Sequence, residues 1–139
     1  MKGIIEMNNA SSTSAGRVSK APFIYVVDDT SELTELYAAV LEATGYCVRT
    51  FNDRAEALTA LKADRAKPDL LITDYLGLSI PVDRFISRCL VVNPALRVLM
   101  ASGFNQTEAR VFSVQPDRFT QKPFTLDELR QEVRAALIV

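Results

Sequence analysis

Short apolar segments of strand length alternate with amphipathic helical patterns along most of this chain. Residues 23–29 read FIYVVDD and residues 69–74 read DLLITD, so their apolar residues are consecutive and do not alternate with polar ones. Strands of this kind are covered on both faces, as in a parallel sheet between two layers of helices. Three further segments are strand-like, namely YCVRTF at 46–51, RVLMAS at 97–102 and RFTQ at 118–121.

Apolar residues at helical spacing follow each of these segments and predict helices that pack one face on the sheet. The predicted core-facing residues are Leu33, Leu36, Tyr37, Val40 and Leu41; Leu58 and Leu61; Val82, Phe85, Ile86, Cys89 and Leu90; and Leu126, Leu129, Val133, Ala136 and Leu137. A shorter helix is expected around residues 105–113. Asp53, with Glu56 three residues later, is typical of a helix start, and Gly45 is typical of a helix end.

This alternation predicts an α/β protein with a three-layer, doubly wound (βα)5 fold, because right-handed crossovers place helices on both faces of a five-stranded parallel sheet. The chain has 139 residues, 48% of them hydrophobic, which suits one domain with a sizeable core. Residues 8–20 are mostly small and polar. We therefore expect residues 1–21 to form a flexible N-terminal tail and residues 22–139 to form the domain.

Composition excludes several classes of protein. The 16 basic and 17 acidic residues leave a net charge of -1, which gives no field that attracts nucleic acid or a membrane surface. No apolar run approaches the roughly 20 residues that cross a bilayer. Cys47 and Cys89 form no metal-binding pattern, so we interpret them as reduced core thiols. We expect a cytoplasmic protein without direct nucleic-acid or membrane contact and without an effector segment after the last predicted helix.

Five polar residues stand at the ends of the predicted strands: Asp28, Asp29, Asp74, Ser102 and Lys122. Each alone has an ordinary explanation as a helix cap, a turn residue or a solvated charge. The carboxyl ends of parallel strands meet at one edge of the sheet, where ligands bind in such folds. Three carboxylates at that edge repel one another unless a cation neutralises them, and Mg²⁺ prefers such oxygen ligands.

This grouping favours phosphoryl transfer to a carboxylate. Asp74 can attack phosphorus in line if Mg²⁺ and the Lys122 ammonium compensate the charge that develops on the equatorial oxygens. The product is an acyl phosphate. The hydroxyl of Ser102 can then donate a hydrogen bond to a phosphoryl oxygen, a contact that exists only in the modified protein and can change its conformation.

The motifs DD at 28–29, ITD at 72–74, ASG at 101–103 and KPF at 122–124 resemble those of the response-regulator receiver family of two-component signalling. The resemblance covers residues 22–138 and implies the flavodoxin-like strand order 2-1-3-4-5. It implies that Asp74 is the phosphoacceptor, with Lys122 and Ser102 beside it. It also implies the metal ligands Asp28, Asp29, Asp74 and the backbone carbonyl of Leu76, and the switch residues Ser102 and Phe119.

The family resemblance also implies the cofactor and the partners. Mg²⁺ is the expected ion, and Mn²⁺ can substitute for it. The phosphoryl group is expected to come from a sensor histidine kinase or a histidine phosphotransfer protein in a phosphorelay. The chain is then a phosphoprotein that catalyses its own phosphorylation and dephosphorylation, and it is not an enzyme with a separate substrate. Its output face, formed by the helix near 105–113, the strand at 118–121 and the last helix, binds a phosphotransfer protein or forms a homodimer.

The segment after the acceptor departs from the family pattern. It reads YLGLSIPVDRF at residues 75–85, where the family usually has a Met-Pro-Gly-like turn. The apolar side chains of Leu76 and Phe104 cannot order an attacking water, so we expect slow loss of the phosphoryl group.

Two other functions are weaker, and one stays open. Haloacid-dehalogenase-type phosphohydrolases have a second Asp two positions after the nucleophile, where this chain has Leu76. The chain has no His and no Gly-rich phosphate loop, which excludes His-dependent nucleophilic catalysis and nucleotide binding of the common loop types. The open alternative is a pseudo-receiver, a docking module with the same fold that is never phosphorylated.

Overall fold

The computed structural model describes residues 21–75, 80–103 and 115–138. The elements in chain order are β1 (Phe23–Val27), α1 (Ser31–Ala43), β2 (Cys47–Phe51), α2 (Arg54–Ala63), β3 (Leu70–Asp74), α3 (Val82–Val92), β4 (Arg97–Ser102), β5 (Arg118–Gln121) and α5 (Leu126–Leu137). The helix expected around 105–113 and nearly all of the expected tail lie outside the described residues. Within those residues, no helix is long and apolar enough to cross a membrane.

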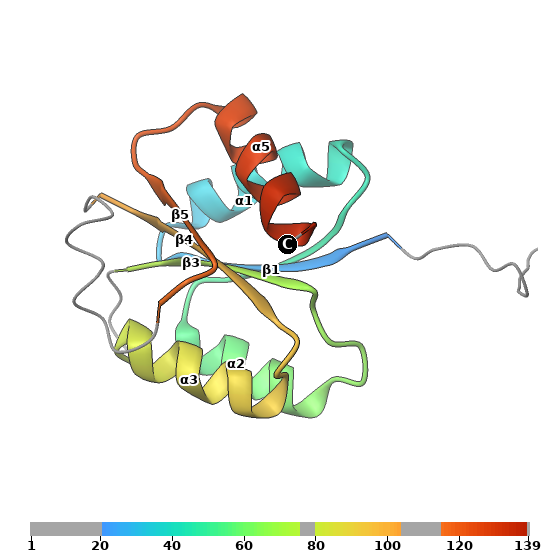
Figure 1. Ribbon diagram of the computed structural model, residues 1–139, viewed down its shortest axis with the longest axis vertical. Coiled ribbons are helices and arrows are strands. Elements are labelled where there is room, and N and C mark those ends of the chain that lie inside the picture. Colours follow the sequence, from blue (N-terminus) through green and yellow to red (C-terminus); the bar gives the residue numbers. More distant parts are fainter. Residues whose placement is uncertain (1–20, 76–79, 104–114, 139) are drawn as a thin grey trace, which may run out of the picture.

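The five strands form one parallel sheet in the order β2-β1-β3-β4-β5, which confirms the predicted fold. In Figure 1, α1 and α5 cover one face of this sheet and α2 and α3 cover the other. The register places Val27 opposite Thr73, and Asp74 opposite Ala101. The carboxyl ends of β1, β3 and β4 therefore meet at one edge of the sheet.

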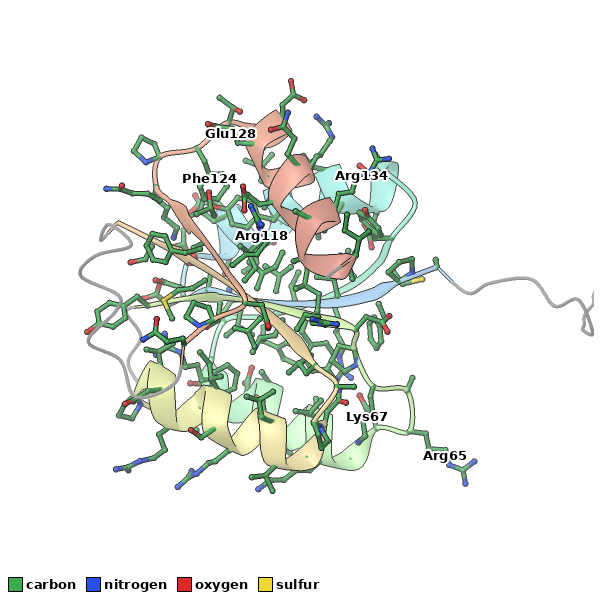
Figure 2. The ribbon with its side chains drawn as sticks, in the orientation of Figure 1. Arg65, Lys67, Arg118, Phe124, Glu128 and Arg134 are labelled. Carbon is green, nitrogen blue, oxygen red and sulfur yellow. The ribbon has the colours of Figure 1, made fainter. Side chains whose placement is uncertain are left out.

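Two apolar clusters fill the space between the layers. One lies between the sheet and α2 and α3 and includes Tyr25, Leu61 and Phe85, while the other lies against α1 and α5 and includes Leu41 and Leu129. Successive strand residues contribute to opposite clusters, which explains the unbroken apolar runs in the sequence. Charged side chains such as Arg65 and Glu128 are exposed on the outside of the layers (Figure 2).

Three residues predicted to lie in the core are exposed. Leu36 is 44% exposed and Leu126 is 36% exposed, because each lies beside the buried stripe of its helix. Thr34, which was not predicted to lie in the core, is buried on α1. Its hydroxyl donates a 3.0 Å hydrogen bond to the carbonyl of Ser31. The interpretation of both cysteines as core thiols is wrong for Cys47, which is exposed on the edge strand β2.

The ends of the helices follow from short-range signals in the sequence. The Asp53 carboxylate accepts from the backbone amide of Glu56 at the start of α2, as predicted. Gly45 adopts a φ of 109° just after α1, in a region that favours glycine. A reciprocal capping box of Thr125 and Glu128 fixes the start of α5, with its N-cap three residues after Lys122.

Candidate functional site

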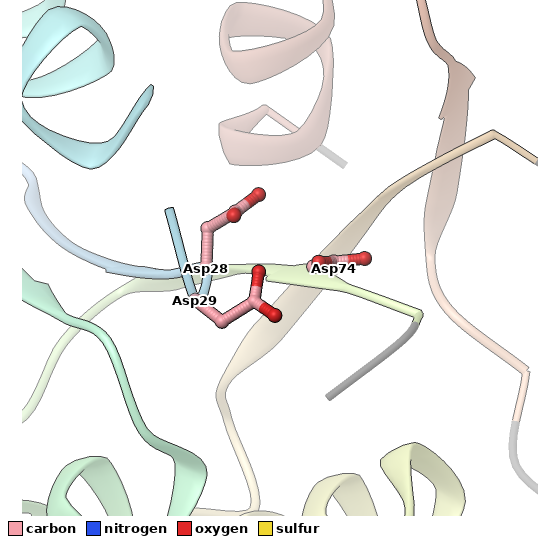
Figure 3. Close-up of side chains that lie close together, drawn as sticks. All are labelled: Asp28, Asp29 and Asp74. Atoms are coloured by element: carbon pink, nitrogen blue, oxygen red, sulfur yellow. The ribbon is translucent and has the colours of Figure 1, made fainter. Parts of the chain in front are cut away.

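Three carboxylates meet at the carboxyl edge of the sheet (Figure 3). Asp28 and Asp29 follow β1 and Asp74 ends the neighbouring strand β3, so the parallel register brings them together. One oxygen from each lies within 4.8 Å of the others. Asp28 is buried, Asp74 is partly buried and Asp29 is exposed. Such a set of oxygen donors, open on one side, fits a hard divalent cation that keeps water or phosphate oxygens in its shell.

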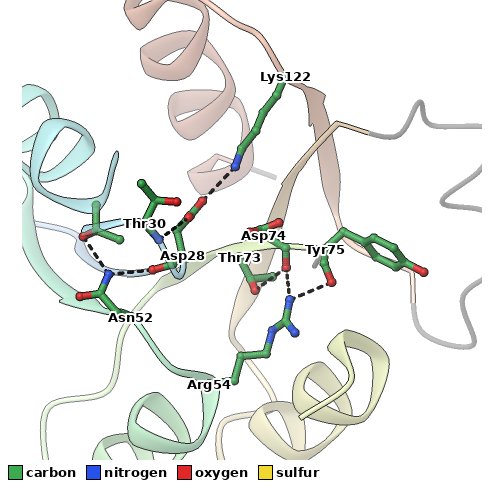
Figure 4. Close-up of polar contacts among 9 residues, drawn as sticks. Asp28, Thr30, Asn52, Arg54, Thr73, Asp74, Tyr75 and Lys122 are labelled. Carbon is green, nitrogen blue, oxygen red and sulfur yellow. Dashed lines mark hydrogen bonds and ion pairs between the residues drawn. The ribbon is translucent and has the colours of Figure 1, made fainter. Parts of the chain in front are cut away.

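Asp28 is held by hydrogen bonds on both carboxylate oxygens (Figure 4). Oδ1 accepts from the backbone amide of Thr30 at 3.0 Å, and Oδ2 accepts from Nζ of Lys122 at 2.9 Å. Burial by itself lowers the pKa of Lys122, but the hydrogen bond and charge of Asp28, with the charge of Asp74, more than offset this effect. The pKa of Lys122 therefore lies above its ordinary value of 10.5, and the ammonium stays charged.

Asn52 connects the end of β2 to the start of α1, a role that sequence reasoning missed. Its Nδ2 donates to the carbonyl of Asp28 at 2.8 Å and to the hydroxyl of Thr34 at 3.3 Å. Its Oδ1 accepts from the hydroxyl of Ser31 at 3.1 Å. These contacts fix the backbone on which Asp28 stands. Its only signal in the sequence was its place directly after a strand, which is equally typical of a turn residue.

Arg54 was also missed. It is the first residue of α2, only 3% exposed, and its guanidinium donates to the carbonyls of Asp74, Tyr75 and Ile80. It therefore approaches the acidic cluster from the side of α2 and α3, while Lys122 approaches from the side of α1 and α5 (Figure 4).

Of the other predicted site residues, two lie within the described part of the chain and two lie outside it. Ser102 is buried at the end of β4, and its carbonyl accepts from the backbone amide of Lys122 at 2.7 Å. Phe119 is partly buried on β5 and packs against the apolar cluster of α2 and α3. Leu76 and Phe104 lie outside the described residues.

The sequence of the chain matches a known protein family. The model of the response regulator receiver domain family matches residues 24–134. The C4-dicarboxylate transport transcriptional regulatory protein DctD of Rhizobium meliloti is 29% identical over 121 residues, which cover 86% of this chain and 26% of DctD. Several other curated relatives are about twice as long as the part that matches.

Solved structures show the same fold. A CheY-like response regulator receiver domain protein from Methanospirillum hungatei has a TM-score of 0.78 at 21% identity and covers 86% of this chain and 95% of its own. The response regulator protein TrrA from Thermotoga maritima, in complex with Mg²⁺ and BeF, has a TM-score of 0.72 at 25% identity and covers 84% of this chain and 99% of its own. With its family match, its sheet order and these neighbours, the chain belongs to the response regulator receiver domain family.

Proposed function

We propose that this chain accepts a phosphoryl group on Asp74 in two-component signalling. The observation that carries the proposal is the meeting of three carboxylate oxygens within 4.8 Å at the edge of the sheet. Asp28, Asp29 and Asp74 would hold a divalent ion, and TrrA, a structural neighbour, is recorded with Mg²⁺ and BeF. Mg²⁺ is the proposed ion and Mn²⁺ a substitute. When bound, it would supply positive charge beside the transferred phosphoryl oxygens.

The proposed reaction transfers a phosphoryl group from an imidazole nitrogen of the donor to a carboxylate oxygen of Asp74. An Asp74 carboxylate oxygen attacks phosphorus while the bond between phosphorus and a donor imidazole nitrogen breaks, and the imidazole leaves with the bonding pair. The donor is a sensor histidine kinase or a histidine phosphotransfer protein. Lys122, on a flexible side chain, exchanges its hydrogen bond with Asp28 for one with a phosphoryl oxygen. Ser102 donates a second hydrogen bond to the phosphoryl group.

These new contacts supply the free energy of a switch, because a modification shifts a conformational equilibrium only through contacts that differ between the states. Ser102 ends β4 and Phe119 lies on β5. A shift of the hydroxyl toward the phosphoryl group makes room for the aromatic ring, which carries no polar atom that burial would leave unsatisfied. The proposed output face therefore includes β5 and α5, and its partner is a phosphotransfer protein or a second copy of the chain.

The experiment is phosphorylation by acetyl phosphate, followed by intact-mass measurement. We expect one added phosphoryl group when Mg²⁺ or Mn²⁺ is present and none when the metal is chelated. Asp74→Asn should remain unmodified, whereas Asp127→Asn, which changes an exposed carboxylate on α5, should be labelled like the wild type. Equal labelling of wild type and Asp74→Asn would refute the proposal. No labelling of the wild type would favour the pseudo-receiver, a docking module without phosphorylation.

A further inference from the structure

Arg54 is a buried cation in an unfavourable position. Its side chain is almost fully buried, and a charge removed from water needs compensation by hydrogen bonds or opposite charges. It also stands in the first turn of α2, where the helix dipole disfavours a positive charge. The ion pairs among the described residues do not include it. Some other interaction must therefore stabilise an arginine at this place.

Three main-chain carbonyls accept hydrogen bonds from this guanidinium. Nη1 donates to the carbonyl of Ile80 at 2.9 Å, and Nη2 donates to the carbonyls of Tyr75, at 2.9 Å, and Asp74. The hydroxyl of Thr73 also donates to the Asp74 carbonyl, at 3.0 Å. The planar guanidinium, with five N–H donors in a rigid fork, can reach several acceptors at once, which an ammonium cannot do as well.

These contacts connect three elements. They join the start of α2 to the last residue of β3 and the residue after it, and to Ile80 just before α3. Arg54 binds the main-chain carbonyl of Asp74, the residue whose side chain is the third carboxylate of the site. Its position relative to Asp28 and Asp29 therefore depends on the direction that this main chain takes at the end of β3.

Charge adds a second, opposing effect. Burial lowers the pKa of Arg54, and the charges of Asp74, Asp29 and Asp28 raise it again without fully restoring its ordinary value. An arginine stays protonated in proteins under such conditions. A fixed positive charge near the three carboxylates also repels a divalent cation. Positioning of Asp74 thus favours metal binding, while the charge of Arg54 opposes it.

We propose that Arg54 is a positioning residue of the phosphorylation site, which holds the main chain of Asp74 and Tyr75 so that the three carboxylates bind one divalent ion. This inference rests on the proposed function, because it concerns the same metal site. Positioning outweighs charge repulsion, since residues that orient metal ligands typically change metal affinity about 10-fold to 100-fold when they are mutated. Arg54→Met should weaken metal binding about tenfold or more.

The experiment measures Mn²⁺ affinity by calorimetry on the full chain, for the wild type, Arg54→Met and Arg54→Lys. Positioning predicts the order wild type, then Lys, then Met, because the ammonium of a lysine can restore part of the carbonyl contact. Charge repulsion alone predicts that Arg54→Met binds most tightly and that Arg54→Lys equals the wild type. Leu61→Ala is the control, since it changes a buried residue of the same helix whose side chain lies in the apolar cluster.

A second readout needs no metal. Amide hydrogen exchange at Tyr75 and Phe85 should be faster in Arg54→Lys than in the wild type, with no such local change in Leu61→Ala. Phe85 reports on the first turn of α3, where its amide donates to the carbonyl of Pro81 at 2.9 Å. If Arg54→Met does not fold, Arg54→Lys decides both measurements.

Metal binding as tight as the wild type in the Arg54 variants, or an equal loss in Leu61→Ala, would overturn the assignment of Arg54. Unchanged exchange at Tyr75 and Phe85 would do so as well. Failure of the wild type to bind Mn²⁺ would instead count against the proposed function, and hydrogen exchange in the metal-free protein would still decide the role of Arg54.

Discussion

Among the residues that the structure describes, Lys122 and Arg54 reach the carboxyl edge from opposite faces of the sheet, and they are held in different ways (Figure 4). Lys122, on the side of α1 and α5, is 25% exposed at its side chain and binds one carboxylate oxygen of Asp28. Arg54, on the side of α2 and α3, is nearly fully buried and binds three main-chain carbonyls. A single, partly exposed contact can be exchanged for a phosphoryl oxygen, whereas three buried contacts make Arg54 part of the scaffold.

The largest expected difference between the two cations is in stability. Arg54→Met removes the guanidinium donor from three carbonyls, of which only that of Asp74 keeps the Thr73 hydroxyl, and should lower the free energy of unfolding by about 2–4 kcal/mol. Lys122→Met removes one hydrogen bond to a carboxylate and should lower it by about 1–2 kcal/mol. Urea unfolding of the metal-free proteins measures both values. If Lys122→Met lowers the free energy of unfolding more than Arg54→Met does, Lys122 is the structural cation and Arg54 is not.

Replacing the two acids after β1 should change the free energy of unfolding in opposite directions when no metal is bound. Asp28→Asn loses the charge that pairs with Lys122 and should lower the free energy of unfolding by about 1–2 kcal/mol. Asp29→Asn removes an exposed charge from a cluster of like charges and should raise it by up to about 1 kcal/mol. Thermal and urea unfolding in the presence of a chelator test this pair. A loss of stability in Asp29→Asn would contradict the arrangement of the three carboxylates.

Metal affinity should change in opposite directions for the two cations. Lys122→Met frees an oxygen of Asp28 and removes a repelling charge, so Mn²⁺ should bind a few-fold more tightly, while Arg54→Met should bind it more weakly. Phosphorylated Lys122→Met should also lack the chemical-shift changes in β5 and α5 that we expect of the phosphorylated wild type. Calorimetry measures the metal affinity, and nitrogen-15 spectra measure the chemical-shift changes. If the variant shows the same spectral changes as the wild type on phosphorylation, Lys122 is not part of the proposed switch.

The smallest effect concerns pH. The pKa of Lys122 is above 10.5 in the folded protein because Asp28 and Asp74 favour its charged form. Its stabilising contribution is therefore complete at neutral pH and is lost only as pH rises through the folded pKa. The difference in free energy of unfolding between wild type and Lys122→Met should be constant from neutral pH to about pH 10 and shrink above it. A difference that already shrinks between pH 7 and about pH 9 would mean that Asp28 does not hold the charge of Lys122.

The sequence was sufficient to predict which strand ends meet. The apolar runs at 23–27 and 70–74 predicted strands buried on both faces, and parallel strands necessarily bring Asp28, Asp29 and Asp74 to one edge. The order of the strands came from the family resemblance, because apolar periodicity does not state which strands are neighbours. The core of α1 was less predictable, since Thr34 is buried with its hydroxyl satisfied while Leu36 remains exposed.

Arg54 and Asn52 were not predictable from local patterns. An arginine directly after a helix-capping aspartate normally lies in solvent, and an asparagine after a strand normally lies in a turn. Arg54 is buried only because Tyr75 and Ile80, more than 20 positions away in the sequence, bring their carbonyls to it. Contacts of this kind arise from the packing of the layers and leave no periodic signal in the sequence.

The exposed thiol of Cys47 has a practical consequence for labelling experiments. Cys47 is the first residue of β2 and lies opposite Phe23, at the amino end of the sheet. It is therefore about 15 Å or more from the acidic cluster, given the rise of about 3.3 Å per residue along a strand. Burial raises the pKa of Cys89 to about 12, so this second thiol does not react in the folded protein. A maleimide dye or a spin label would attach at Cys47 alone and leave the opposite edge accessible to a partner.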